Sequence, residues 1–153
     1  MNVYDAIMQR RTIRKFTQEP VDKDKLIKLV DCARVAAYGA NMQPLKFAVI
    51  DDKKQLNSIY PLTKWAGALA DGAPREGERP TAYIAVLCDK DIRANGAAEV
   101  EAGAAVTTMM LEAVEMGLAT CWLGAFDGDK VHELFGIPAN FRIRALLDFG
   151  AAA

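Results

Sequence analysis

The sequence predicts an α+β fold in which helices cover a β-sheet. Helix-like and strand-like segments interleave along the 153 residues, with about four strands. One strand candidate, 81–88, is apolar at nearly every position, as expected of a central strand covered on both faces. The helix candidate at 97–116 is apolar along most of its faces, so it must be buried on several sides.

The N-terminal part of the chain predicts two helices joined by an extended segment. Apolar residues recur at helical spacing within 2–11 and again from Asp22 to about Ala37. Asp22 is a good N-cap for the second helix. Between the two helices the chain is expected to be extended, from Phe16 to Pro20.

The turn at 38–44 ends the second helix. Gly39 suits a left-handed C-terminal cap, and Pro44 prevents the preceding residue from being helical. After the turn, 46–50 is a short strand candidate, and 53–60 is predicted to form a small helix.

Residues 61–80 are the least regular part of the chain, because Gly and Pro interrupt them repeatedly. We interpret the chain as one domain, 1–153, with a mobile surface excursion at 61–80. A lid over a site and a plain surface loop are both compatible with this composition.

The C-terminal part predicts two more strands around a short helix. Gly117 ends the long helix, and 119–124 is the next strand candidate. Asp127 caps a short helix that Gly136 closes. The last strand is expected at 142–149.

Composition excludes several classes of function. The formal net charge of −1 and the pI of about 5.9 argue against a nucleic-acid groove, which needs a large basic footprint. No run of 18 apolar residues occurs, so no membrane span is expected. The N-terminus lacks the apolar core of a signal peptide, and we therefore expect a cytoplasmic protein.

The metal-ligand inventory predicts no metal site. Cys32, Cys88 and Cys121 lie far apart in apolar surroundings, so we expect buried free thiols. The single histidine, His132, cannot anchor a multi-histidine site, and we expect it on a helix surface.

No self-sufficient catalytic set is found in the sequence. It lacks a GxSxG elbow, an HExxH pair, a P-loop and a GxGxxG turn after a strand. Ser58 is the only serine. Glu99 and Glu101 stand at i, i+2 on a helix and so face different directions. An enzyme built on this chain would therefore need a cofactor for the chemistry, and no side chain is predicted to be a nucleophile.

Three stretches together could bind such a cofactor. The first is the basic turn at 10–14, whose arginines match phosphate oxygens in bidentate fashion; a solvated basic helix end is the alternative. In the second, 38–44, Asn41 and Gln43 could read the edge of a heteroaromatic ring, or could only stabilise their own turn. The third is the strand-to-helix junction 123–127, where small residues let the backbone approach a flat ligand. Helix capping by Asp127 explains that stretch equally well.

These stretches resemble the nitroreductase family of FMN-dependent oxidoreductases. Arg10-Arg11-Thr12-Ile13-Arg14-Lys15-Phe16 is similar to that family's opening RRSxRxF pattern. Tyr38-Gly39-Ala40-Asn41-Met42-Gln43-Pro44 resembles its PSxxNxQP turn. The stretch from Glu101 to Gly124 resembles its long central helix and the strand that follows. The three motifs occur in order and cover most of the chain.

The resemblance implies a three-layer α-β-α fold with a mixed sheet, the long helix at a homodimer interface, and one FMN at each of two subunit interfaces. Arg10, Arg11, Thr12 and Arg14 would hold the phosphate and one edge of the ring. Tyr38, Gly39, Ala40, Asn41 and Gln43 would contact the flavin bound mainly to the other subunit. Leu123, Gly124 and Ala125 would lie near flavin N5, with Lys64 near the pyrimidine carbonyl.

The activity implied by the resemblance is a ping-pong transfer. NADH or NADPH reduces FMN, and a nitroaromatic, a quinone or a similar small acceptor then takes the electrons. A flavin-binding module for storage or sensing, without turnover, is the alternative. A relative that remodels flavin or removes halogens is also compatible with the motifs, whereas a simple interaction domain would bind no flavin.

The chain departs from the family pattern at four places. Thr12 stands where serine is usual, Tyr38 replaces a proline, and Leu45 replaces a frequent tryptophan. Family members usually continue past the last strand with a basic pair and a tail, whereas this sequence stops at Ala153. We expect either a minimal member or a sequence without its C-terminal segment, and the three final alanines favour the second.

Overall fold

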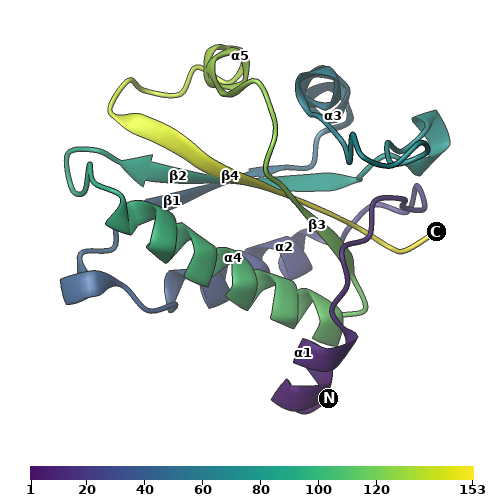
Figure 1. The fold of residues 1–153 in the computed structure, drawn as a ribbon, viewed down its shortest axis with the longest axis horizontal. Coiled ribbons are helices and arrows are strands. Elements are labelled where there is room, and N and C mark those ends of the chain that lie inside the picture. Colours follow the sequence, from purple (N-terminus) through teal and green to yellow (C-terminus); the bar gives the residue numbers. More distant parts are fainter.

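A four-stranded β-sheet forms the middle layer of the protein in the computed structural model, which describes all residues 1–153 (Figure 1). The strand order is β1-β2-β4-β3, and every neighbouring pair is antiparallel. The strands are β1 (Leu45–Ile50), β2 (Ala82–Asp89), β3 (Ala119–Leu123) and β4 (Phe141–Gly150).

Helices cover both faces of the sheet, which confirms the three-layer arrangement (Figure 1). One layer contains α2 (Lys23–Arg34) and α4 (Ala97–Glu115), and the other contains α3 (Lys53–Ile59) and α5 (Gly128–Leu134). The short helix α1 (Val3–Gln9) lies beside α4. Single 3-10 turns occupy Gly39–Asn41 (η1), Tyr60–Leu62 (η2) and Glu76–Glu78 (η3). None of the helices is long and apolar enough to cross a membrane.

The parallel component of the sheet is a single bridge. Thr12 pairs in parallel with Thr120 of β3, and the Ile13 N–H donates to the Thr120 carbonyl at 3.0 Å. Phe16 makes a second, antiparallel bridge with Ala152. The segment after α1 therefore extends the sheet beyond its β3 edge.

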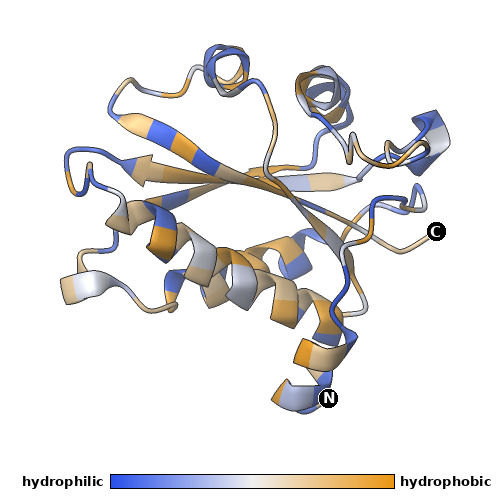
Figure 2. Ribbon diagram, viewed as in Figure 1, coloured by the Kyte–Doolittle hydropathy of each residue, from blue (hydrophilic) through white to orange (hydrophobic).

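β2 is the central strand of the core and separates two apolar clusters. Its even-numbered side chains, such as Ile84 and Val86, pack against α2 and α4. Its odd-numbered side chains, such as Tyr83 and Ala85, pack beneath α3 and α5. The prediction that 81–88 is covered on both faces is confirmed, because every position from Ala82 to Cys88 is buried. Figure 2 shows orange, apolar segments along the strands and along α4.

The helix predicted from Asp22 to about Ala37 ends earlier, at Arg34. Asp22 caps it as expected, accepting from the Asp24 N–H at 2.9 Å. At its other end, the Tyr38 hydroxyl donates to the Ala33 carbonyl at 2.9 Å. This bond satisfies a carbonyl at the helix end and lets the chain leave the helix before Ala37.

A close contact between Gly150 and Phe16 holds the N-terminal segment against the end of β4. The Phe16 side chain is fully buried. A Cβ added to Gly150 would lie 2.8 Å from Phe16 Cδ1 and 3.0 Å from its Cβ. Phe16 cannot retreat easily, because its backbone N–H also donates to the Glu78 carbonyl at 2.9 Å.

We predict that Gly150→Ala lowers the free energy of unfolding by about 1–3 kcal/mol, the usual cost of overpacking a filled core. Urea denaturation measures this. Gly77→Ala is the matched control, because no heavy atom lies within 4 Å of its added Cβ. Equal stabilities of the two variants would show that Phe16 does not constrain Gly150.

Candidate functional site

The basic run 10–15 begins where α1 ends and follows the β3 edge. The Arg10 N–H donates to the Ala6 carbonyl at 3.0 Å, which makes Arg10 the C-cap of α1. The Ile13–Thr120 hydrogen bond then fixes the backbone of the run beside β3. The Arg11 guanidinium donates to the Met8 carbonyl at 2.7 Å and to the Arg10 carbonyl at 2.8 Å. Arg11 therefore caps the helix end, whereas the rest of the run is extended.

The arginines of this run are not neutralised within the chain. Lys15 pairs with Asp71 at 2.8 Å and with Glu78 at 3.8 Å. Arg10, Arg11 and Arg14 form no ion pair with any carboxylate. Three guanidiniums without a counter-charge form a donor set that suits a phosphate group.

The strand-to-helix junction 123–127 meets Lys64. The Lys64 N–H donates to the Ala125 carbonyl at 2.9 Å, and Thr63 forms an antiparallel bridge with Phe126. Gly124 and Ala125 are exposed, and a Cβ on Gly124 would meet no atom within 4 Å. Leu123 is buried in the core, whereas the backbone at Gly124 faces open space.

Asp127 has the capping role that the sequence left as an alternative. Its side chain accepts from the Lys130 N–H at 3.1 Å at the start of α5. That backbone bond, followed by the Lys130 side chain and more weakly by the Lys64 ammonium, holds the pKa of Asp127 below its usual value. Lys64 therefore carries its charge close to the junction.

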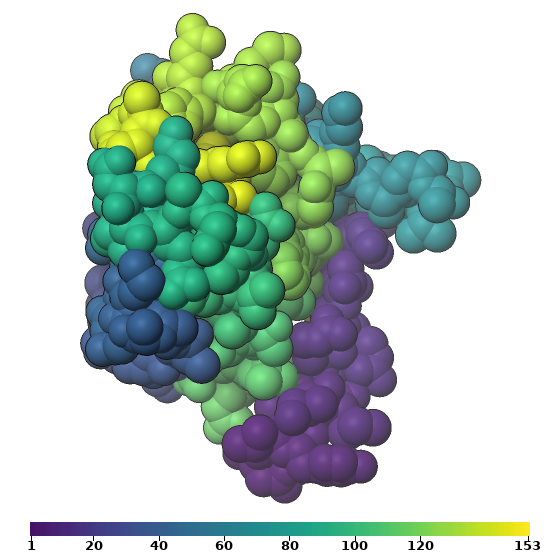
Figure 3. Space-filling view, turned by 60° about the vertical axis from the view of Figure 1, so that its left-hand side comes forward, coloured from purple at the N-terminus to yellow at the C-terminus, as the bar shows by residue number.

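The excursion at 61–80 is tied to the basic run. Besides the Lys15–Asp71 pair, the Phe16 N–H binds the Glu78 carbonyl, and the Tyr60 hydroxyl donates to the Pro74 carbonyl at 2.6 Å. In Figure 3 the excursion, in teal, stands out from the surface, with the purple N-terminal segment below it. Its mobility stays a prediction.

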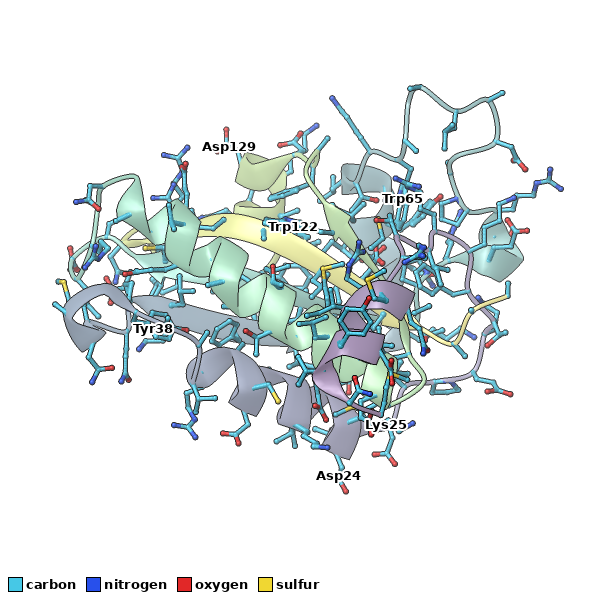
Figure 4. The ribbon with its side chains drawn as sticks, turned by 60° about the horizontal axis from the view of Figure 1, so that its bottom comes forward. Asp24, Lys25, Tyr38, Trp65, Trp122 and Asp129 are labelled. Carbon is cyan, nitrogen blue, oxygen red and sulfur yellow. The ribbon has the colours of Figure 1, made fainter.

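The turn at 38–43 lies away from the basic run, at the other end of α4 (Figure 1). The Gly39 N–H donates to Glu101 Oε1 at 2.8 Å, near the start of α4. α1, which leads into the basic run, is tied to the far end of α4 by the Met1–Glu115 ion pair at 3.0 Å. Figure 4 shows Tyr38 at the left of the view and α1, in purple, right of its centre. One chain thus presents two half-sites.

Gly39 does not form the predicted left-handed cap. Positive φ angles occur instead at Ala40 (50°), Asn41 (53°) and Gln43 (50°). The Gln43 amide donates to Asn41 Oδ1 at 2.8 Å, so the amides partly stabilise their own turn. Asn tolerates the left-handed region better than other non-glycine residues, which is the signal that would have placed the turn at Asn41.

Sequence reasoning missed Glu101 and Arg93, which hold this turn. Glu101 is 5% exposed, and its Oε1 lies 3.6 Å from Arg93 Nε. Arg93 Nη2 also donates to the Gly39 carbonyl at 3.1 Å. As helical spacing predicted, Glu99 and Glu101 face different directions: Glu99 pairs with Arg144 at 2.8 Å and does not contact the turn. No local pattern signals that Glu101 is the buried one.

Sequence reasoning also missed a buried polar row beneath the basic run. Tyr83, Asp148 and Cys121 are cross-strand neighbours on β2, β4 and β3. Asp148 is fully buried, and its Oδ1 accepts from the Cys121 N–H at 2.8 Å. Its Oδ2 and the Tyr83 hydroxyl have no hydrogen-bond partner. The one available signal was an aspartate within the apolar run from Ala145 to Phe149.

Burial dominates the electrostatics of this row. It raises the pKa of Asp148 well above its usual value, while the Cys121 N–H and the Arg14 guanidinium act in the opposite direction. Burial, and next the Asp148 charge, raise the pKa of Cys121 to about 12. Burial likewise raises the pKa of Tyr83. The thiol of Cys121 is consequently a poor nucleophile at neutral pH.

An apolar surface lies between the two half-sites. It combines exposed residues of α1 and α4 with Trp122 of β3, which is 43% exposed and whose ring atom Cη2 lies 3.7 Å from the Cβ position of Gly103 (Figure 4). We call it the α1–α4 face. Its most exposed members are Val3, Tyr4, Ile7, Met8, Val100 and Trp122.

Five hollows of the single chain are lined by none of the arginines of the basic run. One hollow of about 520 Å³ lies between α3 and the segment 76–81, and another of about 310 Å³ lies between β1 and the segment 135–141. Arg10, Arg11 and Arg14 line none of the hollows described for this chain. No group of three or more His, Cys, Asp or Glu residues could hold a metal ion. The arginines border open surface, so one chain alone does not enclose a ligand bound to them.

Comparisons with known proteins agree on one family. A model of the nitroreductase family matches residues 7–151. A 5,6-dimethylbenzimidazole synthase from Rhodospirillum rubrum is 27% identical, over 95% of this chain and 80% of that protein. A nitroreductase family protein from Clostridium novyi superposes with a TM-score of 0.85 at 29% identity, over 100% of this chain and 86% of that one. A Desulfovibrio desulfuricans structure in complex with FMN gives 0.83 at 28% identity, with 100% and 87% covered.

We predict that Glu101→Ala lowers the free energy of unfolding by about 1.5–3 kcal/mol, because the Gly39 N–H and Arg93 then lose a charged partner. Glu101→Gln keeps an acceptor for Gly39 and should cost less. Glu133→Ala, an exposed glutamate without an ion pair, is the control in urea denaturation. If Glu101→Ala lowers the free energy of unfolding no more than this control does, Glu101 does not hold the turn.

Proposed function

The chain belongs to the nitroreductase family and is an enzyme of that family, an oxidoreductase, and we propose that FMN is its cofactor and NADH or NADPH its reductant. The observation that carries this proposal is the set of three guanidiniums without a counter-charge beside an open strand-to-helix junction. An FMN complex among the similar structures, and a Bacillus subtilis relative named FMN reductase [NAD(P)H], support it.

The basic run fits the phosphate of FMN. Arg10 and Arg14 have no competing carboxylate, and the exposed Thr12 offers a hydroxyl beside them. Phosphate oxygens accept bidentate hydrogen bonds from such guanidiniums. Arg11 already donates to backbone carbonyls, so we assign it the electrostatic part of the site, with Arg10 and Arg14 as the direct donors.

The junction fits the redox end of a flavin. FMN, when bound, supplies the hydride chemistry that no side chain here provides. The exposed backbone at Gly124 and Ala125 lets a flat ring approach closely, and Leu123 supports it from the core. Lys64 holds a positive charge at the same place, where it would stabilise negative charge on a reduced ring.

A homodimer would complete each site. Tyr38, Gly39, Ala40, Asn41 and Gln43 cannot reach the basic run of their own chain, because α4 separates the two. In a two-fold assembly through the α1–α4 face, the turn of one subunit can lie beside the basic run of the other. Burial of exposed apolar residues such as Tyr4 and Trp122 would drive this association.

The acceptor that we propose is a flat organic molecule, such as a nitroaromatic or a quinone. Two half-reactions would alternate at one open site in a ping-pong sequence. Storage or sensing of flavin without turnover is the competing function. The cytoplasmic location that the sequence suggests stays a prediction.

Purified protein, loaded with FMN, should show the oxidised flavin spectrum and should bleach anaerobically on addition of NADH or NADPH. A quinone or a nitroaromatic should then restore the absorbance, because the flavin passes its electrons on. Visible spectroscopy under anaerobic conditions measures both steps. A flavin that binds but is never bleached would support storage or sensing, and absence of FMN binding would refute the proposal.

We expect Arg10→Ala to weaken FMN binding by about 1.5–3 kcal/mol, the size of a charged hydrogen bond, or roughly 10- to 150-fold in Kd. Flavin fluorescence quenching measures the Kd. Lys23→Ala is the control, because Lys23 is exposed at the start of α2 and forms no ion pair. An unaltered Kd for Arg10→Ala would remove Arg10 from the phosphate site.

A further inference from the structure

The 38–43 turn combines backbone strain with exposure. Ala40, Asn41 and Gln43 have φ angles of 50°, 53° and 50°, in the left-handed region that residues other than glycine rarely adopt. Every residue from Gly39 to Gln43 is exposed, so burial in the core does not enforce this conformation. Strain of this kind persists only where surrounding groups fix it, and it is common in segments that hold ligands. The groups that fix this turn are therefore candidates for a functional role.

Arg93 and Glu101 hold the turn from its protein side. Glu101 Oε1 accepts from the Gly39 N–H at 2.8 Å, and Arg93 Nη2 donates to the Gly39 carbonyl at 3.1 Å. Arg93 Nη2 also lies 3.0 Å from Met42 Sδ. The pair thus binds both polar backbone groups of Gly39, and it contacts the chain again beyond the first two strained residues. The turn is fixed on both sides of its strained part.

The Arg93–Glu101 pair has no other polar task in the chain. Every side-chain hydrogen bond of the two residues goes to Gly39 or Met42. Within the pair, Arg93 Nε lies 3.6 Å from Glu101 Oε1, and neither Arg93 Nε nor Glu101 Oε2 has a hydrogen-bond partner. A buried ion pair with incomplete hydrogen bonding adds little net stability. Its position beside an exposed, strained turn points instead to control of the turn's conformation.

Gly39 allows the pair to come this close. A Cβ added to Gly39 would lie 3.1 Å from Arg93 Nη2 and 3.2 Å from Glu101 Oε1. Any side chain at this position would displace one of the two charged groups from the backbone that it binds. The absence of a side chain at position 39 is therefore explained by contact with the Arg93–Glu101 pair rather than by a left-handed cap.

We propose that Arg93 and Glu101 are positioning residues, which hold the 38–43 turn of one subunit in the shape that receives the FMN bound at the basic run of the other. This inference rests on the proposed FMN site and homodimer. Glu101 is 5% exposed, so it acts through the turn and does not itself touch FMN. The pair presents the exposed Asn41 and Gln43 side chains in a fixed arrangement.

A preformed turn strengthens binding because its ordering cost is met before the ligand arrives. If the turn has the receptive shape for only part of the time, the observed Kd rises by the inverse of that fraction. Loss of the Glu101 carboxylate releases the Gly39 N–H and deprives Arg93 of its counter-charge, so the strained residues are then free to relax. Weaker FMN binding follows, although no group that contacts FMN has been removed.

The first test uses the protein without FMN. Hydrogen exchange of the Gly39 N–H, followed by NMR, should be roughly tenfold faster in Glu101→Ala than in the wild type, because a charged hydrogen bond is lost. Glu101→Gln keeps an acceptor and should exchange more slowly than Glu101→Ala. Equal exchange rates in Glu101→Ala and the wild type would show that the turn is fixed by other groups, and would overturn the proposal.

The second test is the Kd of FMN. We expect Glu101→Ala to raise it roughly tenfold, as for a turn that is receptive about a tenth of the time, and Glu101→Gln to raise it less. Leu26→Ala is the control for stability, because it removes a fully buried side chain at the far end of α2 from the turn. Its Kd should equal that of the wild type. An unchanged Kd in Glu101→Ala, or an equal rise in Leu26→Ala, would overturn the positioning role.

The third test asks which subunit the turn serves. A mixed dimer of an Arg10→Ala chain and a Glu101→Ala chain, isolated with two different affinity tags, pairs an intact basic run with an intact turn in one of its two sites. We expect one FMN per dimer to bind with the Kd of the wild type. If no site regains that Kd, the turn does not act across the interface and the proposal is wrong.

Failure of this inference differs from failure of the proposed function. If the wild type binds FMN and Glu101→Ala binds it equally well, only the positioning role is lost. If the wild type binds no FMN, the cofactor assignment is wrong and the role of Arg93 and Glu101 toward FMN falls with it, even where Gly39 exchanges as expected.

Discussion

The hydrogen bond from the Ile13 N–H to the Thr120 carbonyl is the constraint on which the site depends. It makes the segment after α1 an extension of the sheet, and so converts a basic run that could have been a solvated helix end into one wall of a site. Phe16 reinforces the placement by filling the space that Gly150 leaves open. Because the run is fixed at both points, Arg14 lies beside β3 and is only half-exposed. Local charge gives this stretch its chemistry, and sheet pairing gives it its position.

The length of α4 explains why one chain offers only half-sites. It is long enough to hold the 38–43 turn through Glu101 near its start and α1 through Glu115 at its end. The same helix is apolar on nearly all faces, yet Val100 near its start remains exposed, as do Tyr4 and Ile7 of α1 near its end. A protein that separates its binding groups and leaves an apolar surface between them has the features of a subunit whose site is shared. The proposed dimer and the proposed flavin site are thus supported by the same geometry.

Much of this architecture follows from sequence patterns, because period and capping are local. The continuous apolar run identified β2, and Asp22 and Asp127 marked their helices. The errors have non-local causes. The Tyr38 hydroxyl ended α2 early, and the positive φ angles fell on Ala40, Asn41 and Gln43 rather than on Gly39. Asp148 and Glu101 were missed because a buried acidic residue is defined by groups far away in the sequence. Arg14 and Lys64 were named from a family pattern, and their placement beside β3 and beside Ala125 required the fold.

The anchoring of Lys64 has a consequence for how this enzyme could change. Backbone hydrogen bonds secure the two ends of the excursion: Lys64–Ala125 near its start and Phe16–Glu78 near its end. The residues between these points form a loop on a fixed base. Lengthening such a loop costs little closure entropy, about 0.6 kcal/mol for each doubling. Insertions and deletions there could reshape the rim of the site while Lys64 stays in place, so acceptor preference could diverge without redesign of the flavin-binding framework.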